Sequence, residues 1–85
     1  MRPTDPIAET VKSFVLEEFL PGADPGEVTE STPLISGGVL DSLATVKLVA
    51  FLEERYRVTI DPHEASVDYL DTIPQIAALV RGKLQ

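Results

Sequence analysis

A connection of twenty residues, Pro21 to Leu40, joins the first two helical segments of this 85-residue chain and contains three prolines and four glycines. Connections of this length are uncommon in compact domains and are usually either functional or disordered. Apolar residues recur along it and can hold it against a core: Val28, Leu34, Ile35, Val39 and Leu40. The sequence therefore predicts an ordered, packed loop, with a tight turn at Gly37-Gly38.

Helical segments are expected on both sides of this loop. Before it, apolar residues recur at helical spacing: Ile7, Val11, Phe14, Val15 and Phe19. Asp5 is a suitable cap with Pro6 at the first helical position, and Leu20-Pro21-Gly22 ends the segment. After the loop, a second helix is predicted from about Ser42 to Tyr56.

Two capping patterns mark the remaining segments. Asp61-Pro62-His63-Glu64 predicts a short helical turn as a weak third element, and Thr72-Ile73-Pro74-Gln75 opens a final helix. The side chains expected to point inward from the final helix are Ile73, Ile76, Ala77, Val80 and Leu84. No strand alternation or repeat is present, so the predicted class is all-α.

The second helix has two apolar faces. The predicted core stripe comprises Thr45, Leu48, Leu52 and Tyr56, flanked by Ala44, Val49 and Phe51. Leu43, Val46 and Ala50 fall on the opposite face, surrounded by Lys47, Glu53 and Glu54. A helix in so small a domain needs one buried stripe, so the second stripe suggests a docking surface, although scattered surface apolar residues are also normal.

Composition favours a small carrier or adaptor over an enzyme. Residues 1–85 are expected to form a single domain with one thin core and little room for a deep catalytic cleft. The net charge of −7 disfavours nucleic-acid binding and steers the chain toward basic partner surfaces. Without cysteine there is no thiol nucleophile. No signal pattern or membrane-length apolar stretch is present, so we expect a cytoplasmic protein without membrane insertion.

The junction between the loop and the second helix carries the functional prediction. Asp41 is a strong N-cap candidate, and Ser42 follows it at the start of the helix. The first turn of a helix has unpaired N–H groups and partial positive charge, which favour an anionic group. A phosphodiester on the Ser42 hydroxyl would lie in that field, where a modifying enzyme can reach it.

The chain resembles acyl and peptidyl carrier proteins through residues 32–60, T-P-L-I-S-G-G-V-L-D-S-L-A-T-V-K-L-V-A-F-L-E-E-R-Y-R-V-T-I. The later D-Y-L-D-T-I resembles the start of their last helix, so that the resemblance spans nearly the whole chain. D-S-L alone is unspecific, but its position after a long loop and before L-x-x-x-L-E-E is much more specific. The resemblance implies a four-helix bundle with a long first loop and a short third helix.

The same resemblance implies the chemistry. A phosphopantetheinyl transferase would attach 4′-phosphopantetheine from coenzyme A to Ser42, beside Asp41, and the terminal thiol of the arm would carry acyl groups as thioesters. The chain would then be a monomeric carrier and not an enzyme. Its partners would be the transferase, an adenylating or acyltransferase loading enzyme, and a downstream synthase, tailoring or condensing enzyme. Leu43, Val46, Lys47 and Ala50 are the predicted partner-docking residues.

Departures from the family pattern narrow the prediction. Carriers of fatty-acid synthesis tend to have an acidic second helix, whereas Ala44 and Lys47 occupy such positions here. D-S-L-A-T-V-K-L is closer to free-standing aminoacyl carriers and to discrete carriers of natural-product pathways. We therefore expect a free-standing carrier in a polyketide- or nonribosomal-peptide-like pathway, with a D-alanyl carrier of cell-wall modification as the alternative.

Other chemistry is weaker in this sequence. A serine hydrolase would need Ser42 with a histidine and an acid, but G-x-S-x-G is absent and the single histidine, His63, is expected on a solvated turn. The acidic residues lack calcium-loop spacing, so no metal site is predicted. The rival from another class is a helical interaction module without a cofactor, in which Leu43, Val46 and Ala50 form the contact patch.

Overall fold

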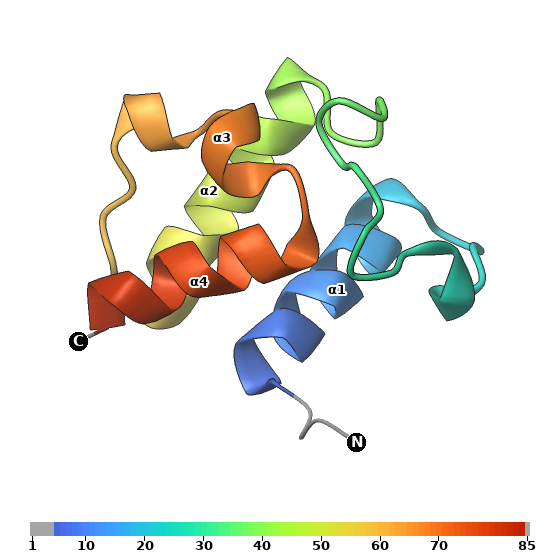
Figure 1. Cartoon of the computed structure of the whole chain (residues 1–85), viewed down its shortest axis with the longest axis horizontal. Helices are drawn as coiled ribbons and strands as arrows, with labels where there is room; N and C mark the ends of the chain where they lie inside the picture. The colour runs from blue at the N-terminus through green and yellow to red at the C-terminus, as the bar shows by residue number, and fades with distance from the viewer. Residues whose placement is uncertain (1–4, 85) are drawn as a thin grey trace.

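The computed structural model describes residues 5–84, and all regular secondary structure in that range is helical (Figure 1). Its helices are α1 (Pro6–Phe19), α2 (Ser42–Tyr56), α3 (Val67–Leu70) and α4 (Ile73–Leu84), with 3₁₀ turns η1 (Pro25–Glu27) and η2 (Pro62–Glu64). The predicted four-helix bundle with a long first loop and a short third helix is confirmed.

Capping residues start the long helices where the sequence predicts. The Asp5 carboxylate accepts the Ile7 N–H at 3.0 Å, with Pro6 as the first residue of α1. At α4, the Gln75 side chain accepts the Thr72 N–H at 3.0 Å, and the Gln75 N–H donates to the Thr72 hydroxyl at 3.3 Å. These side chains satisfy N–H groups that a helix cannot pair within itself.

Helix α4 crosses the front of the molecule in Figure 1 and contacts α1, α2 and α3. Phe14 of α1 stacks on Phe51 of α2 with ring centroids 4.0 Å apart, and meets Phe19 edge to face. The buried apolar core contains residues from all four helices, from the connection between α1 and α2, and from the connection between α2 and α3. These residues are Val11, Val15, Val28, Leu34, Leu40, Ala44, Leu48, Leu52, Ile60, Leu70, Ile73, Ile76, Ala77 and Val80. One apolar core thus fixes the relative positions of the helices.

One predicted core residue of α4 is outside the core. Leu84 is 50% exposed, whereas Ile73, Ile76, Ala77 and Val80 are buried as expected. Leu84 lies in the final turn of α4. The helical period placed Leu84 on the correct face, but a face is buried only where another element covers it.

The third helical segment is more complex than the sequence predicted. Asp61-Pro62-His63-Glu64 forms the expected turn, η2, in which the Asp61 N–H donates to the Glu64 carboxylate at 2.9 Å. The third α-helix is a separate single turn, Val67–Leu70, which begins after Ser66. Its Leu70 is fully buried against the core. Packing of one leucine therefore stabilises a turn too short to be marked by periodicity.

The connection between α1 and α2 is ordered and packed, as predicted. Val28, Leu34 and Leu40 are almost completely buried. Gly38 has φ +86°, the left-handed conformation that glycine adopts without strain, and a Cβ at Gly37 would collide with the Pro33 carbonyl. The glycine pair therefore closes the tight turn that the sequence predicted.

Within residues 5–84, no helix combines the length and apolar character needed to span a bilayer.

The two faces of α2 should respond differently to truncation. Leu48→Ala should lower the free energy of unfolding by about 2–5 kcal/mol, because Leu48 is fully buried and the cavity would persist. Leu43→Ala, the matched change on the exposed face, should shift it by no more than about 0.5 kcal/mol. Urea unfolding followed by circular dichroism measures both. A loss in Leu43→Ala as large as in Leu48→Ala would contradict the assignment of faces.

Candidate functional site

Ser42 is the first residue of α2 and its side chain is exposed. Asp41 before it is the N-cap, and its carboxylate accepts the Ala44 N–H at 2.8 Å. The Asp41 carbonyl accepts both the N–H and the hydroxyl of Thr45, at 2.9 and 2.8 Å. Leu40, immediately upstream, is 2% exposed. A buried anchor and a capped first turn thus hold a solvent-facing serine in one place.

Backbone donors at this helix terminus remain available. The Asp41 carboxylate and carbonyl accept the N–H groups of Ala44 and Thr45, respectively. The N–H groups of Ser42 and Leu43 have no hydrogen-bond partner among residues 5–84, nor does the Ser42 hydroxyl. Unpaired N–H groups and the helix dipole favour an anion at this position.

A groove of about 660 Å³ adjoins Ser42. Its walls come from the loop before α2, from the first two turns of α2, and from the segment between η2 and α3: Ile35, Leu40, Asp41, Ser42, Thr45, Val46, Val49, Pro62, Ala65 and Ser66. Most of these side chains are apolar. An extended chain attached to Ser42 can therefore lie along an apolar surface.

Asp71, at the end of α3, binds the loop that precedes Ser42. One carboxylate oxygen accepts the N–H groups of Ile35 and Ser36 at 2.9 and 2.8 Å, and the other accepts the Ser36 hydroxyl at 2.8 Å. The Asp71 carbonyl accepts the Leu34 N–H at 2.6 Å. We call this set of four hydrogen bonds the Asp71 clamp.

The clamp also determines the protonation of Asp71. The hydrogen bond from the Ser36 N–H is the largest influence lowering the pKa of Asp71, with further lowering from the Ser36 hydroxyl and the Ile35 N–H, against partial desolvation. Hydrogen bonds to a carboxylate favour its charged form. No role for Asp71 can be predicted from the local sequence, because no local pattern links Asp71 to Ser36, which lies 35 positions away.

The predicted docking residues lie together on the exposed face of α2. Leu43 and Val46 are 66% and 64% exposed, and Lys47 and Ala50 are exposed beside them. We call these four residues the docking face. Val67 and Tyr69 of α3 are also exposed apolar side chains, at 44% and 39%. The sequence did not single these two out, because the short third element was predicted at residues 61–64 and not at 67–70.

Glu53 has a structural role that differs from its expected position around the docking face. Its carboxylate accepts the Ile60 N–H at 2.8 Å, and Ile60 is buried. Glu53 therefore fixes the segment after α2 against the helix. Glu54 is exposed as expected.

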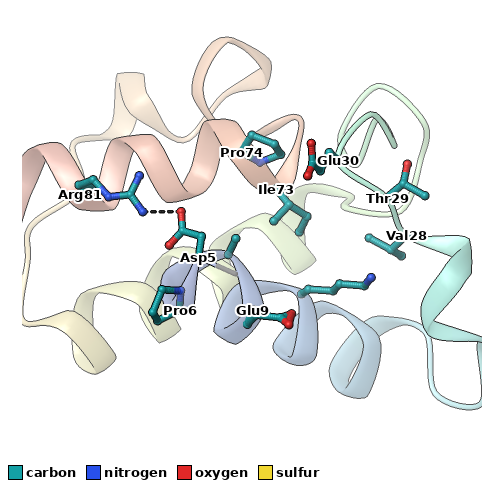
Figure 2. A pocket seen from close by; sticks show the side chains of 11 residues that line it. Asp5, Pro6, Glu9, Val28, Thr29, Glu30, Ile73, Pro74 and Arg81 are labelled. Atoms are coloured by element: carbon teal, nitrogen blue, oxygen red, sulfur yellow. Dashed lines mark hydrogen bonds and ion pairs between the residues drawn. The ribbon is translucent and has the colours of Figure 1, made fainter. Parts of the chain in front are cut away.

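A second hollow, of about 590 Å³, lies between α1 and α4 and shares no residue with the groove at Ser42 (Figure 2). The Arg81 guanidinium crosses it to the Asp5 carboxylate. This hydrogen bond is the largest influence lowering the pKa of Asp5. Val28 and Ile73, which are both buried, line this hollow, and none of its lining residues belongs to the groove at Ser42.

Asp61, His63 and Glu64 bring three ligand-type atoms within 4.8 Å of one another in η2. The Glu64 carboxylate already accepts the Asp61 N–H and pairs with the Lys83 ammonium at 2.9 Å. That ion pair is the largest influence lowering the pKa of Glu64. The arrangement ties η2 to the last turn of α4, and His63 lies on an exposed turn as predicted.

Comparison with known proteins identifies the family. The solved structure named KstB-PCP, in its apo form, matches with a TM-score of 0.66 and 34% identity, over 88% of this chain and 82% of its own. PCP is the abbreviation for peptidyl carrier protein. The chain therefore belongs to the family of acyl and peptidyl carrier proteins.

A curated relative points to a biosynthetic setting. Lincomycin biosynthesis protein LmbN of Streptomyces lincolnensis is 41% identical over 66 residues. The match covers 78% of this chain but 24% of LmbN, so the chain spans about a quarter of the length of that relative. No family model matches the chain.

The Asp71 clamp should make stability depend on acid pH. The pKa of Asp71 lies below the unfolded value of about 3.9, so its stabilising contribution is present above about pH 4 and is lost as pH falls through the folded pKa. Asp71→Asn should lower the free energy of unfolding near neutral pH. The free energy of unfolding of Asp71→Asn should also fall less than that of the wild type when the pH is lowered from about 7 to about 3.

Urea titrations across this pH range measure the effect. Asp68→Asn removes the same charge from α3, and the Asp68 carboxylate makes no hydrogen bond within residues 5–84, so it serves as the matched control. The prediction fails if Asp71→Asn loses as much stability on acidification as the wild type and Asp68→Asn.

Proposed function

We propose that this chain is one carrier domain that holds 4′-phosphopantetheine on Ser42 and presents acyl or aminoacyl groups to partner enzymes. The observation that carries the proposal is the capped loop-to-helix junction, which leaves one exposed serine at the start of α2 in a chain of the carrier family. The terminal thiol of the bound group supplies the thioester chemistry, which a chain without cysteine lacks.

Three features of the site support the fit of this group. The Ser42 hydroxyl is exposed and uncommitted within residues 5–84, so a transferase can reach it. The N–H groups of Ser42 and Leu43 and the positive end of α2 favour a phosphodiester there. The adjoining groove of about 660 Å³ offers apolar walls to an extended arm. Asp41 keeps the first turn of α2 formed while its own carboxylate remains engaged with Ala44.

The pathway we propose is natural-product biosynthesis. The relative LmbN is named as a lincomycin biosynthesis protein, and it shares 41% identity over the matched region. The partners are then a phosphopantetheinyl transferase, an adenylating or acyltransferase loading enzyme, and a downstream synthase, tailoring or condensing enzyme.

Ser42→Ala should abolish attachment. Intact mass spectrometry after incubation with coenzyme A and a promiscuous phosphopantetheinyl transferase should show one added group on the wild type and none on Ser42→Ala. The fold should persist, because an exposed substitution shifts stability by about 0.5 kcal/mol or less.

Ser31→Ala is the matched control, because Ser31 is an exposed serine in the loop that precedes α2. It should gain the group like the wild type. Modification that persists in Ser42→Ala would refute the site. A wild-type chain that gains no mass would favour a helical interaction module without a cofactor.

We further propose that partners bind the docking face, Leu43, Val46, Lys47 and Ala50, mainly through apolar contact. Leu43 and Val46 are the most exposed large apolar side chains of residues 5–84 and lie within one turn of Ser42. Lys47 places a positive charge among them, which disfavours a partner surface rich in arginine or lysine. Apolar burial then supplies most of the contact energy, and peripheral charges mainly affect the encounter rate.

Val46→Asp should leave the fold intact but raise KM for phosphopantetheinyl transfer about tenfold or more, because a carboxylate at a dry contact costs at least ~1–3 kcal/mol. Glu54→Lys tests charge without disturbing the hydrogen bond of Glu53. Its effect should be small and screened by salt. The kinetics of phosphopantetheinyl transfer to both variants, measured across a salt series, distinguish apolar contact from charge attraction. A steep loss of affinity with salt, together with a larger defect in Glu54→Lys than in Val46→Asp, would contradict the apolar model.

A further inference from the structure

A short path of backbone hydrogen bonds connects Asp71 to Leu40, which lies two residues before Ser42. The Asp71 carbonyl accepts the Leu34 N–H at 2.6 Å, and the Leu34 carbonyl accepts the Leu40 N–H at 2.8 Å. Leu40 precedes the N-cap of α2 by one residue. Two backbone hydrogen bonds through a single residue therefore link the end of α3 to the junction that presents the serine.

The loop between Leu34 and Leu40 has little freedom to move around these bonds. Leu34, Leu40 and Leu70 are almost completely buried. The Gly38 N–H donates to the Ile35 carbonyl at 3.1 Å, which closes the turn between the two anchored leucines. The chain therefore leaves the loop at Asp41 in a direction determined by where residues 34–36 are held.

The same loop forms one wall of the groove at Ser42. Ile35 and Leu40 line that groove together with Thr45 and Val46 of α2. The Ile35 N–H is one of the donors to the Asp71 carboxylate, so the position of this wall also depends on the clamp. Val46 belongs both to this groove and to the docking face. All four docking-face residues are nevertheless carried by α2 itself, and within residues 5–84 none of them is a hydrogen-bond partner of Asp71.

We propose that Asp71 is a positioning residue for attachment at Ser42: by holding residues 34–36 it sets the direction of the loop that leads into α2 and the place of the serine hydroxyl. This inference rests on the proposed function of Ser42. The residue does not touch the serine: its carboxylate holds Ile35 and Ser36, its carbonyl holds Leu34, and Leu34 in turn holds Leu40. Its loss therefore affects the transfer step more than partner binding.

The test compares Asp71→Asn with Asp68→Asn in phosphopantetheinyl transfer from coenzyme A, followed by intact mass. Asp71→Asn should reduce kcat about tenfold or more with little change in KM, because displacement of a reacting group by about 1 Å costs up to ~100-fold in rate. KM is preserved because the docking face is intact. Asp68→Asn should match the wild type in both parameters.

Amide hydrogen exchange supplies a second readout that is independent of transfer. The amides of Leu34, Ile35, Ser36 and Leu40 should exchange faster in Asp71→Asn, while amides in the middle of α2 keep their protection. Ser36→Ala removes only the bond from the Ser36 hydroxyl to Asp71. It should cause a smaller decrease in kcat in the same direction, and it replaces Asp71→Asn as the deciding variant if that protein does not fold.

Several outcomes overturn the inference. A folded Asp71→Asn with the kcat of Asp68→Asn would show that the clamp does not position the serine. A raised KM with unchanged kcat would show that Asp71 affects binding instead. If Asp71→Asn does not fold, an unchanged kcat in Ser36→Ala has the same consequence. The failure of the proposed function differs from all of these, because the wild type itself would then gain no mass.

Discussion

The order of the long connection depends on where its backbone hydrogen bonds go. Residues 34–36 lie outside any helix, and buried or half-buried N–H groups must find acceptors. Asp71 provides these acceptors with one carboxylate oxygen and its own carbonyl, and its other carboxylate oxygen accepts the Ser36 hydroxyl. With this segment fixed, Leu34 and Leu40 enter the core and α2 begins at one defined residue. The position of Ser42 follows from that beginning.

Helix α2 combines packing and display in one element. Ala44, Leu48 and Leu52 are buried, whereas Leu43 and Val46 are exposed on the other side. The helical period places the buried and the exposed side chains on opposite faces, so a side chain on one face can be substituted without altering the contacts of the other face. A small domain with one thin core gains from this separation, because the partner recognition proposed for the exposed face places no demand on the residues that keep the domain folded.

The site requires little from the protein beyond position. The elements of the proposed site are one exposed hydroxyl, two backbone N–H groups without a partner within residues 5–84, and an adjoining apolar groove. Asp41 and Asp71 act on backbone geometry and not on a reacting atom. The likeness to KstB-PCP and the relation to LmbN agree with a chain that positions a tethered group for other enzymes.

The sequence by itself determined the elements that local chemistry controls. Capping residues fixed the starts of α1, α2 and α4, helical spacing placed Leu48 and Leu43 on opposite faces, and the glycine pair marked the turn before Ser42. Only the tertiary structure decided which faces are covered, and so left Leu84 exposed and buried Leu70 in a one-turn helix. It also decided the role of Asp71, because a hydrogen bond between residues 35 positions apart depends on the packing of α3 and leaves no local pattern.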